Sequence, residues 1–568
     1  MSKLPWLKTI ISALLLLPAV VSAADRVGDF SLLDQDGYFH NMRWYNDHAA
    51  VAFLVQANDS AATEAAVSAY DTLKSKYDAQ GIEFMMLNPM GRLNRGEVAA
   101  KVDEYGVKMP VLMDDARVIS KLLGVEKTGE VLLFNPTSFT VGFRGPVSQA
   151  EAAIEEILAG KDVSNPVIAT NGSAVTYPES VQTVSYEKDI APVIAENCAE
   201  CHREGGIAPF AMNSHAMVQG WSPMIREVLM TKRMPPAQID AHVGDFVNDM
   251  LISDAEMQKI LYWIDAGSPN DGAIDPLAQL TWPESKWAFG EPDYIIKVPP
   301  QSVPASGVLD YRYVTVPIDI EEDKWVRASQ YLAGDRTVLH HTLNSIVEPG
   351  QDQRRGFLGG GNPDQANIAA YVPGGEPQME PPNTGGLLKA GSKLNLQLHY
   401  TTNGRETVDA GEIGLWFYPD DQIPEERMSG ACACIFTQNW TDIPPHAKAF
   451  EQTQSITLTR EAELHSMLSH MHFRGKYMRF YADYPDGSRE ELLNIADYDY
   501  AWQLGYQLRE PKLMPAGTVL TAVGAFDNSA QNPMNPDPDR SVPWGQQSWD
   551  EMFFGSFRWK YTDQGGGD

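Results

Sequence analysis

The chain carries one short pattern with a specific chemistry, Cys198-Ala199-Glu200-Cys201-His202. In a C-x-x-C-H pattern the two thiols form thioethers with the haem vinyl groups, and the adjacent histidine becomes the proximal ligand of the iron. A bare C-x-x-C pair would also suit thiol redox chemistry or zinc. The histidine directly after the pair, and the lack of a second cysteine pair nearby, argue against both. We therefore predict one covalently bound haem c, held by Cys198, Cys201 and His202.

The sixth ligand of this iron should be a downstream methionine or histidine, because such ligands suit electron transfer. Met234 is the best candidate, since the prolines after it in the 232–236 segment (Lys-Arg-Met-Pro-Pro) would hold a rigid ligand loop. The segment resembles the turn that carries the axial methionine in small bacterial cytochromes c. His215, Met217 and Met224 are the alternatives, each better explained as a surface or core residue.

The informative histidines lie further along the chain, in short β-like runs: His340-His341, His399, and His470 with His472. On a strand, residues two apart share a face, so His470 and His472 can hold one metal together. The adjacent His340 and His341 point to opposite faces, and joint ligation requires a strand end or a bulge. Imidazole suits copper. Structural hydrogen bonding and a three-histidine zinc site are the alternatives.

A methionine follows near the C-terminus, Met552 in the 548–554 segment Ser-Trp-Asp-Glu-Met-Phe-Phe. In their order, these four motifs resemble the type II copper, ascorbate-dependent monooxygenases, the family of peptidylglycine α-hydroxylating monooxygenase and dopamine β-monooxygenase. The resemblance covers about residues 280–562 and implies two copper ions. It assigns the electron-transferring copper to His340, His341 and His399, and the catalytic copper to His470, His472 and Met552. A packing role in the core is the alternative for Met552.

The resemblance implies that O2 binds at the catalytic copper, that a C–H bond of an organic substrate is hydroxylated, and that one oxygen atom becomes water, which consumes two electrons. A haem on the same chain raises the effective concentration of the electron donor beside the first copper. We expect electrons to pass from an external donor through the haem to the two coppers. The alternative is a non-catalytic electron-transfer or copper-binding haem protein.

The chain departs from the animal members of that family. It lacks most of their cysteines and keeps only Cys432 and Cys434 in this region, a pair whose close spacing would strain a mutual disulfide. Two free thiols, a strained bridge and an adventitious copper site all stay open. Their substrate-binding residues have no counterpart here, so the substrate is unknown. His446 and His465 are interpreted as surface residues.

The N-terminal part alternates β-rich runs with helical stretches, a rhythm typical of an α/β sheet. It resembles the thioredoxin-like fold of redoxins through Val27-Gly28-Asp29-Phe30 and the strand that ends at Val55. Where redoxins place a reactive cysteine, residues 56–61 read Gln-Ala-Asn-Asp-Ser-Ala, and the loop that usually holds a cis-proline reads Thr128-Gly129-Glu130-Val131. Because thiol–disulfide chemistry needs a thiolate, Ser60 and Gly129 argue against it, and we predict a docking or structural module.

The expected fold is therefore multidomain, with an α/β thioredoxin-like domain, a small α-helical cytochrome c domain and two antiparallel β-sandwiches. The predicted helix that ends the haem domain starts at the capping box of Ser253 and Glu256. The predicted boundaries are a signal peptide at 1–23, the thioredoxin-like domain at 24–160, a linker at 161–184, the cytochrome c-like domain at 185–271, and the β-sandwiches at 280–425 and 426–562.

Composition limits the partners and the compartment. The formal net charge is −31 with no basic block, which argues against nucleic acid as a partner. The first residues have the shape of a cleavable secretory signal, with Lys3 and Lys8 before an apolar stretch and Val21-Ser22-Ala23 before Ala24. We expect a periplasmic or secreted protein with no membrane span after cleavage.

Overall fold

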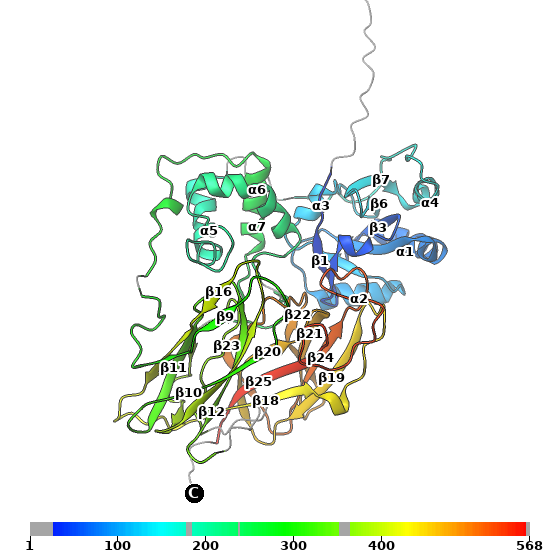
Figure 1. Cartoon of the computed structure of the whole chain (residues 1–568). Coiled ribbons are helices and arrows are strands. Elements are labelled where there is room, and N and C mark those ends of the chain that lie inside the picture. The colour runs from blue at the N-terminus through cyan, green and yellow to red at the C-terminus, as the bar shows by residue number, and fades with distance from the viewer. Residues whose placement is uncertain are drawn as a thin grey trace, which may run out of the picture.

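The computed structural model describes residues 26–177, 184–236, 239–283, 285–351, 364–375 and 377–563 (Figure 1). The predicted signal peptide at 1–23 lies outside the described residues. Within these ranges, no helix combines the length and the apolar character needed to cross a membrane. The described α-helices all lie before residue 266, and the rest of the chain is built mainly from strands.

The N-terminal region alternates strands and helices: β1 (Ser31–Asp34), β2 (Phe39–Asn41), η1 (Met42–Tyr45), β3 (Ala50–Val55), α1 (Ala61–Tyr77), η2 (Asp78–Gln80), β4 (Ile82–Asn88), α2 (Arg95–Tyr105), β5 (Val111–Met113), α3 (Val118–Leu122), β6 (Glu130–Asn135), β7 (Thr140–Pro146) and α4 (Val147–Leu158). The strands form one sheet in the order β2-β1-β5-β4-β3-β6-β7. β3, β4 and β5 are parallel, whereas β6 and β7 are antiparallel. All of β3 is buried, as expected for a central strand covered on both faces. This region is α/β and thioredoxin-like, as predicted.

The start of α1 holds a serine close to the position where redoxins carry a reactive cysteine. Ser60 caps the helix by accepting a hydrogen bond from the Thr63 amide. Its hydroxyl donates to the Thr128 hydroxyl at 2.7 Å. Gly129 has φ +76°, and a Cβ there would lie 2.7 Å from the Ala62 carbonyl oxygen, so only glycine permits this close approach. The helix start and the loop before β6 therefore meet through two hydroxyl groups.

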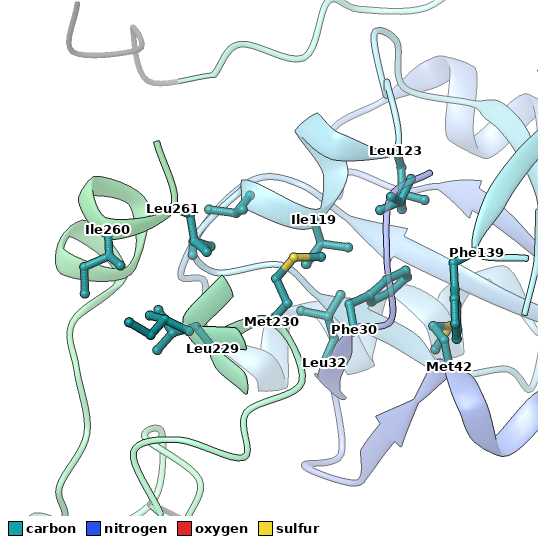
Figure 2. Close-up of a cluster of buried hydrophobic side chains, with 14 of the residues drawn as sticks. Phe30, Leu32, Met42, Ile119, Leu123, Phe139, Leu229, Met230, Ile260 and Leu261 are labelled. Atoms are coloured by element: carbon teal, nitrogen blue, oxygen red, sulfur yellow. The ribbon is translucent and has the colours of Figure 1, made fainter. Parts of the chain in front are cut away.

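The helical region comprises η3 (Tyr186–Ile190), α5 (Ala191–Asn197), α6 (His215–Met230), α7 (Asp254–Asp265) and η4 (Leu277–Gln279). α7 begins at the predicted capping box of Ser253 and Glu256. Its Leu261, together with Met230 of α6, belongs to the same hydrophobic core as Phe30 of the α/β region (Figure 2). The two regions share one core, so burial of apolar surface couples their stabilities.

The first β region contains β8 (Tyr294–Lys297), β9 (Gln301–Val303), β10 (Arg312–Pro317), β11 (Lys324–Leu332), β12 (Leu339–Val347), β13 (Gln378–Met379), β14 (Gly386–Leu388), β15 (Lys393–Tyr400), β16 (Thr407–Asp409) and β17 (Glu412–Phe417). The described pairings are antiparallel. The sheets β10-β15-β12 and β13-β11-β17-β8 both contribute to one core, which includes Leu396 and Leu415.

The second β region contains β18 (Met428–Ile435), η5 (Thr437–Asn439), β19 (Phe450–Thr457), β20 (Ala462–His470), β21 (Gly475–Asp483), β22 (Arg489–Ile495), β23 (Gly505–Met514), β24 (Val519–Phe526) and β25 (Phe553–Tyr561). Its two four-stranded antiparallel sheets have the orders β18-β25-β20-β23 and β19-β24-β21-β22. Phe557 of one sheet and Phe480 of the other meet in their common core.

Two connecting segments bind to neighbouring regions. In the predicted linker, the Ile168 amide donates a hydrogen bond to the Arg144 carbonyl of β7. This part of the linker therefore lies along the edge of the α/β sheet. Between α6 and α7, Phe246 forms a bridge with Leu508 of β23 and lies in the core of the second β region. The first contact keeps the segment after α4 on the α/β sheet, and the second ties the segment between α6 and α7 to the second β region.

Candidate metal and haem sites

The first histidine cluster lies where β12 pairs with β15. The pairing slips between Leu339 and His341, and this irregularity is the bulge that lets adjacent histidines face one site. His341 lies opposite His399 in the ladder. One ligand nitrogen from each of His340, His341 and His399 lies within 4.8 Å of the other two. The structure therefore brings together the three residues predicted for the first copper.

The nitrogen atoms of this cluster fit a metal ion. The Nδ1 atoms of His340 and His341 lie 2.9 Å apart, and two nitrogens that are each about 2.0 Å from one ion are separated by about 3 Å. Nε2 of His340 and Nδ1 of His399 are buried and have no hydrogen-bond partner among the described residues. Buried polar atoms normally have partners, so the orphaned Nδ1 of His399 indicates a ligand. For His340, whose ring offers one nitrogen to an ion, either Nδ1 or Nε2 is the ligand atom.

Burial keeps these imidazoles neutral. Burial, and next the neighbouring His399, lowers the pKa of His340 to about 3. Burial, and then His470, lowers the pKa of His399 to about 4. The pKa of His341 also lies well below its usual range, chiefly because the ring is buried. Since neutral imidazole is the form that binds metals, the cluster can take up an ion at neutral pH without releasing protons.

The second cluster lies at the end of β20. The rings of His470 and His472 are 5.1 Å apart between centroids. His470 Nδ1 donates to the Gln503 side-chain oxygen at 2.7 Å, and His472 Nδ1 donates to the Asp550 carbonyl at 3.3 Å. Both rings therefore carry the lone pair on Nε2, and Nε2 of His472 is buried without a described partner. Hydrogen bonds of this kind fix the orientation of metal-binding imidazoles.

Met552 lies near this cluster, two residues before Phe554 of β25. His470 pairs with Phe554 in the last row of the ladder, and their rings stack at 5.6 Å between centroids. Glu551, directly before Met552, accepts a hydrogen bond from the His472 amide. The Met552 side chain is buried in a cluster with Phe554 and Cys434. A thioether next to two imidazoles is a donor set that suits Cu(I).

The two clusters lie next to each other. The ring centroids of His341 and His470 are 6.1 Å apart. Tyr500 lies against both clusters, because its ring stacks on His340 at 4.4 Å and meets His472 edge-on at 6.2 Å. Four of the five histidines are buried, and His470 is partly exposed. The five imidazoles thus form one connected group at the junction of the two β regions.

A buried carboxylate that the sequence did not single out holds the second cluster. Glu551 is fully buried and accepts hydrogen bonds from the His472 amide at 2.8 Å and the Arg474 amide at 2.6 Å. Burial raises the pKa of Glu551 to about 8, and these two amides and the Arg474 charge act against the shift. Its position directly before Met552 was the only sequence signal for this role.

The C-x-x-C-H pattern follows α5, and its side chains fit a covalently bound haem. Cys198 and Cys201 are free thiols. His202 Nδ1 donates to the Phe210 carbonyl at 3.0 Å, which leaves Nε2 as the ligand atom, as in an axial histidine. Burial, and then Glu200, raises the pKa of Cys201, while the charge of Arg336 lowers it. Arg336 comes directly before the segment that leads into β12.

The residues weighed as sixth ligands lie at different places. Met234 lines a cavity of about 110 Å3 together with Leu32 and Asp114 of the α/β region. His215 is buried, and its Nε2 pairs with the Ser268 carbonyl at 2.9 Å, which is a structural role. Met217 and Met224 are exposed. Coordination by Met234 stays a prediction.

A cleft of about 1440 Å3 separates the two β regions. Its lining includes Asn344 and Leu394 from the first region, and Ser466 and Phe554 from the second. None of the six candidate copper ligands is in this lining. The cleft approaches the second cluster through Phe554, whose ring stacks on His470. It offers room for a substrate one residue away from that cluster.

Two histidines outside the clusters differ from each other. His446 is exposed and pairs with Asp539, as interpreted from the sequence. The surface interpretation of His465 is wrong, because this residue is only 9% exposed and its Nε2 has no described partner. A slip in the pairing between Leu464 and Ser466 turns the side chain inward, and it lines the cleft.

Comparisons with known proteins add little. No protein-family model and no curated protein matches the chain. Among solved structures, a hypothetical protein from Sinorhizobium meliloti is 20% identical, with 28% of this chain and 96% of that chain covered, at a TM-score of 0.26. An uncharacterized conserved protein from Geobacillus kaustophilus is 16% identical, with 28% and 95% covered, at a TM-score of 0.25. A secreted Mycobacterium tuberculosis disulfide oxidoreductase homologous to E. coli DsbE is 13% identical, with 23% and 95% covered, at a TM-score of 0.19. No argument rests on likenesses this low, and the α/β region is assigned on its own strand order.

Proposed function

We propose that the chain is an exported copper-dependent monooxygenase that hydroxylates a C–H bond of an organic substrate with O2 and receives electrons through its own c-type haem. One observation carries the proposal. Five histidines, three of which have an unpartnered ring nitrogen, converge at the junction of the two β regions and beside a large cleft. The two β regions then correspond to the two β-sandwiches of the copper monooxygenases, and the helical region to a cytochrome c domain.

The residues of the chain prepare this site for two copper ions. His340, His341 and His399 would hold the electron-transferring copper, and His470, His472 and Met552 the catalytic copper. When bound, copper supplies one-electron redox chemistry and a binding place for O2, and a thioether ligand favours its Cu(I) state. The second cluster is fixed before any metal arrives, because Asp550 and Gln503 orient the two rings.

The position of the C-x-x-C-H pattern supports delivery of electrons within the chain. The helices lie over the end of the first β region that holds β9 and β16 (Figure 1). The charge of Arg336, which precedes β12, acts on the pKa of Cys201 and is in keeping with this arrangement. Attachment to the same chain raises the effective concentration of the donor far above that of a diffusing protein. An external donor, either a small reductant or a redox protein, would reduce the haem.

The cleft supports an enzyme rather than a metal store. Storage needs ligands but no substrate space, whereas hydroxylation needs a pocket near the catalytic metal. The cleft comes within one residue of that site, through Phe554. Asn344, His465 and Trp559 line the cleft with polar atoms that lack partners within the described part of the chain.

The α/β region contributes structure in this proposal. Its former redox positions hold the hydroxyls of Ser60 and Thr128. Its core continues into the helices that would carry the haem. We propose that it positions the haem region and docks a redox partner.

Metal and haem content of the full chain, expressed with haem maturation, tests the proposal. We expect about two coppers and one haem per chain, with O2 consumption that is lost in Met552→Ala. The matched control is Met534→Ala, because Met534 is 52% exposed and lies outside the cluster. One haem with zinc, or with no copper, would contradict the proposal. Copper bound without O2 consumption would favour the alternative, a non-catalytic copper-binding haem protein.

A further inference from the structure

Cys432 and Cys434 lie on the same sheet face as the second histidine cluster. β25 is the neighbour of both β18 and β20. Cys434 pairs with Phe554, which in turn pairs with His470, and Cys432 pairs with Ser556 in the adjoining row. Residues opposite each other in an antiparallel ladder share a face. Two strand spacings of about 4.8 Å therefore separate the Cys434 backbone from that of His470, a distance of about 10 Å.

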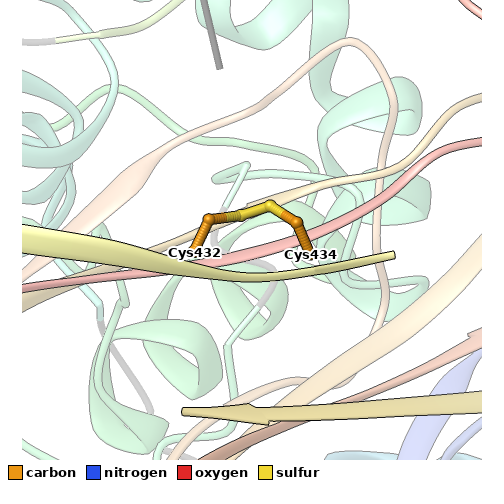
Figure 3. Close-up of a disulfide and its surroundings, with 2 residues drawn as sticks. All are labelled: Cys432 and Cys434. Carbon is orange, nitrogen blue, oxygen red and sulfur yellow. A yellow bond between two sulfur atoms is a disulfide. The ribbon is translucent and has the colours of Figure 1, made fainter. Parts of the chain in front are cut away.

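The two sulfur atoms belong to the surroundings of Met552. Cys434, Met552 and Phe554 form one buried cluster, and Cys432 packs against it. Both cysteines also line the cleft, so reagents that enter the cleft can reach them. In this structure a disulfide joins them (Figure 3).

This disulfide does little for the stability of the fold. A disulfide stabilises a protein mainly by closing a long loop of the unfolded chain. Cys432 and Cys434 are separated by one residue and lie on one strand that β25 already holds along its whole length. A role in metal binding explains this pair of cysteines better than a role in stability. Two thiolates beside the Met552 thioether form a soft donor set that selects Cu(I).

We infer that Cys432 and Cys434 form a thiol-gated Cu(I) site on the wall of the cleft, from which copper passes to the position next to Met552. An external dithiol opens the gate. It breaks the S–S bond, gives two electrons and two protons to the two cysteines, and is itself oxidised to a disulfide. The two thiols then bind one Cu(I) as thiolates and release two protons. The inference rests on the proposed function only in taking Met552 as a copper ligand.

The test is an anaerobic titration of the haem-loaded full chain with Cu(I), in competition with a chromophoric Cu(I) chelator. Protein reduced with dithiothreitol and desalted is compared with oxidised protein. We expect about one additional tightly bound Cu(I) per chain after reduction, with sulfur scattering in the copper X-ray absorption spectrum. The additional ion should be absent in Cys432→Ser and Cys434→Ser. It should be present in Ser556→Ala, which changes the cross-strand neighbour of Cys432.

Equal Cu(I) binding before and after reduction would overturn the inference, as would an additional ion that persists in Cys432→Ser. Alkylation of the reduced wild-type thiols provides a second test without any substitution and should remove the same ion. His470→Ala separates the two proposals. If the oxidised protein binds its histidine coppers and reduction adds none, only the inference fails. If a cysteine-dependent ion is the only copper bound, and His470→Ala leaves it unchanged, the proposed function fails and the thiol site stands.

Discussion

Glu551→Ala is the substitution whose effect the structure defines best. The buried carboxylate accepts hydrogen bonds from the amides of His472 and Arg474 in the turn between β20 and β21. Alanine removes both acceptors and leaves two buried donors. Each unsatisfied buried donor costs about 1–3 kcal/mol, so the free energy of unfolding of the metal-free protein should fall by roughly 2–6 kcal/mol. Glutamine keeps one acceptor oxygen, and Glu551→Gln should cost about half as much.

The same substitution should weaken one copper site and spare the other. The turn held by Glu551 carries His472, and loss of such support typically lowers metal affinity by about 10–100-fold. The site of His340, His341 and His399 has no contact with Glu551 among the described hydrogen bonds and should keep its affinity.

Urea unfolding and a copper competition titration measure these two effects. Glu463→Ala is the matched control, because this carboxylate is partly exposed and pairs with Lys560 at the surface. It should change the free energy of unfolding by less than about 1 kcal/mol. If Glu551→Ala unfolds and binds copper like the wild type, Glu551 does not hold the His472 turn and the positioning argument is refuted.

Three further outcomes are expected. Burial lowers the pKa of His340 from 6.5 to about 3, so between these two pH values the unfolded chain binds one proton more than the folded protein. The free energy of unfolding therefore keeps its full value above pH 6.5 and falls as the pH drops toward 3. In urea unfolding of the metal-free protein, His340→Gln should reduce the dependence of the unfolding free energy on pH by up to about 1.4 kcal/mol per pH unit; an unchanged slope would contradict the burial argument. His399→Ala should remove one of two coppers, measured by elemental analysis, and leave the haem absorbance unchanged; loss of both coppers would contradict two separate sites. Arg558 of the second β region pairs with Glu380 of the first. Arg558→Met leaves this carboxylate unpaired and should lower the free energy of unfolding by about 1–3 kcal/mol, part of which Glu380→Gln restores in a double-mutant cycle. A coupling energy near zero would show that the pair does not join the two regions.

Local signals in the sequence predicted the parts of the fold that depend on neighbouring residues. The capping box of Ser253 and Glu256 starts α7 because both partners lie within one helical turn. The adjacent His340 and His341 required a bulge, and the ladder of β12 has one. The alternation of strands and helices likewise predicted an α/β sheet, and the resemblance carried by Val27-Gly28-Asp29-Phe30 implied its thioredoxin-like class.

Features made by distant segments could not be predicted in this way. The hydrogen bond between Glu551 and the His472 amide joins residues 79 positions apart, and no local pattern reports it. His465 reads as a surface residue until the slip in the pairing of β20 turns it into the cleft. The α/β region also shares one core with α6 and α7. Each element's apolar face can be predicted from its own residues, but the partner against which that face packs cannot.

Reoxidation of the haem by O2 shows whether electrons pass from the haem to the coppers. The copper-loaded protein is reduced anaerobically and then mixed rapidly with O2 in a buffer that contains no chelator. The oxidation state of the haem is followed by its visible absorbance. We expect fast reoxidation in the wild type and in Met534→Ala, and slow reoxidation in His399→Ala and Met552→Ala. Reoxidation at one common rate in all four proteins, or none in the copper-loaded wild type, would contradict electron transfer from the haem to a copper centre that reacts with O2.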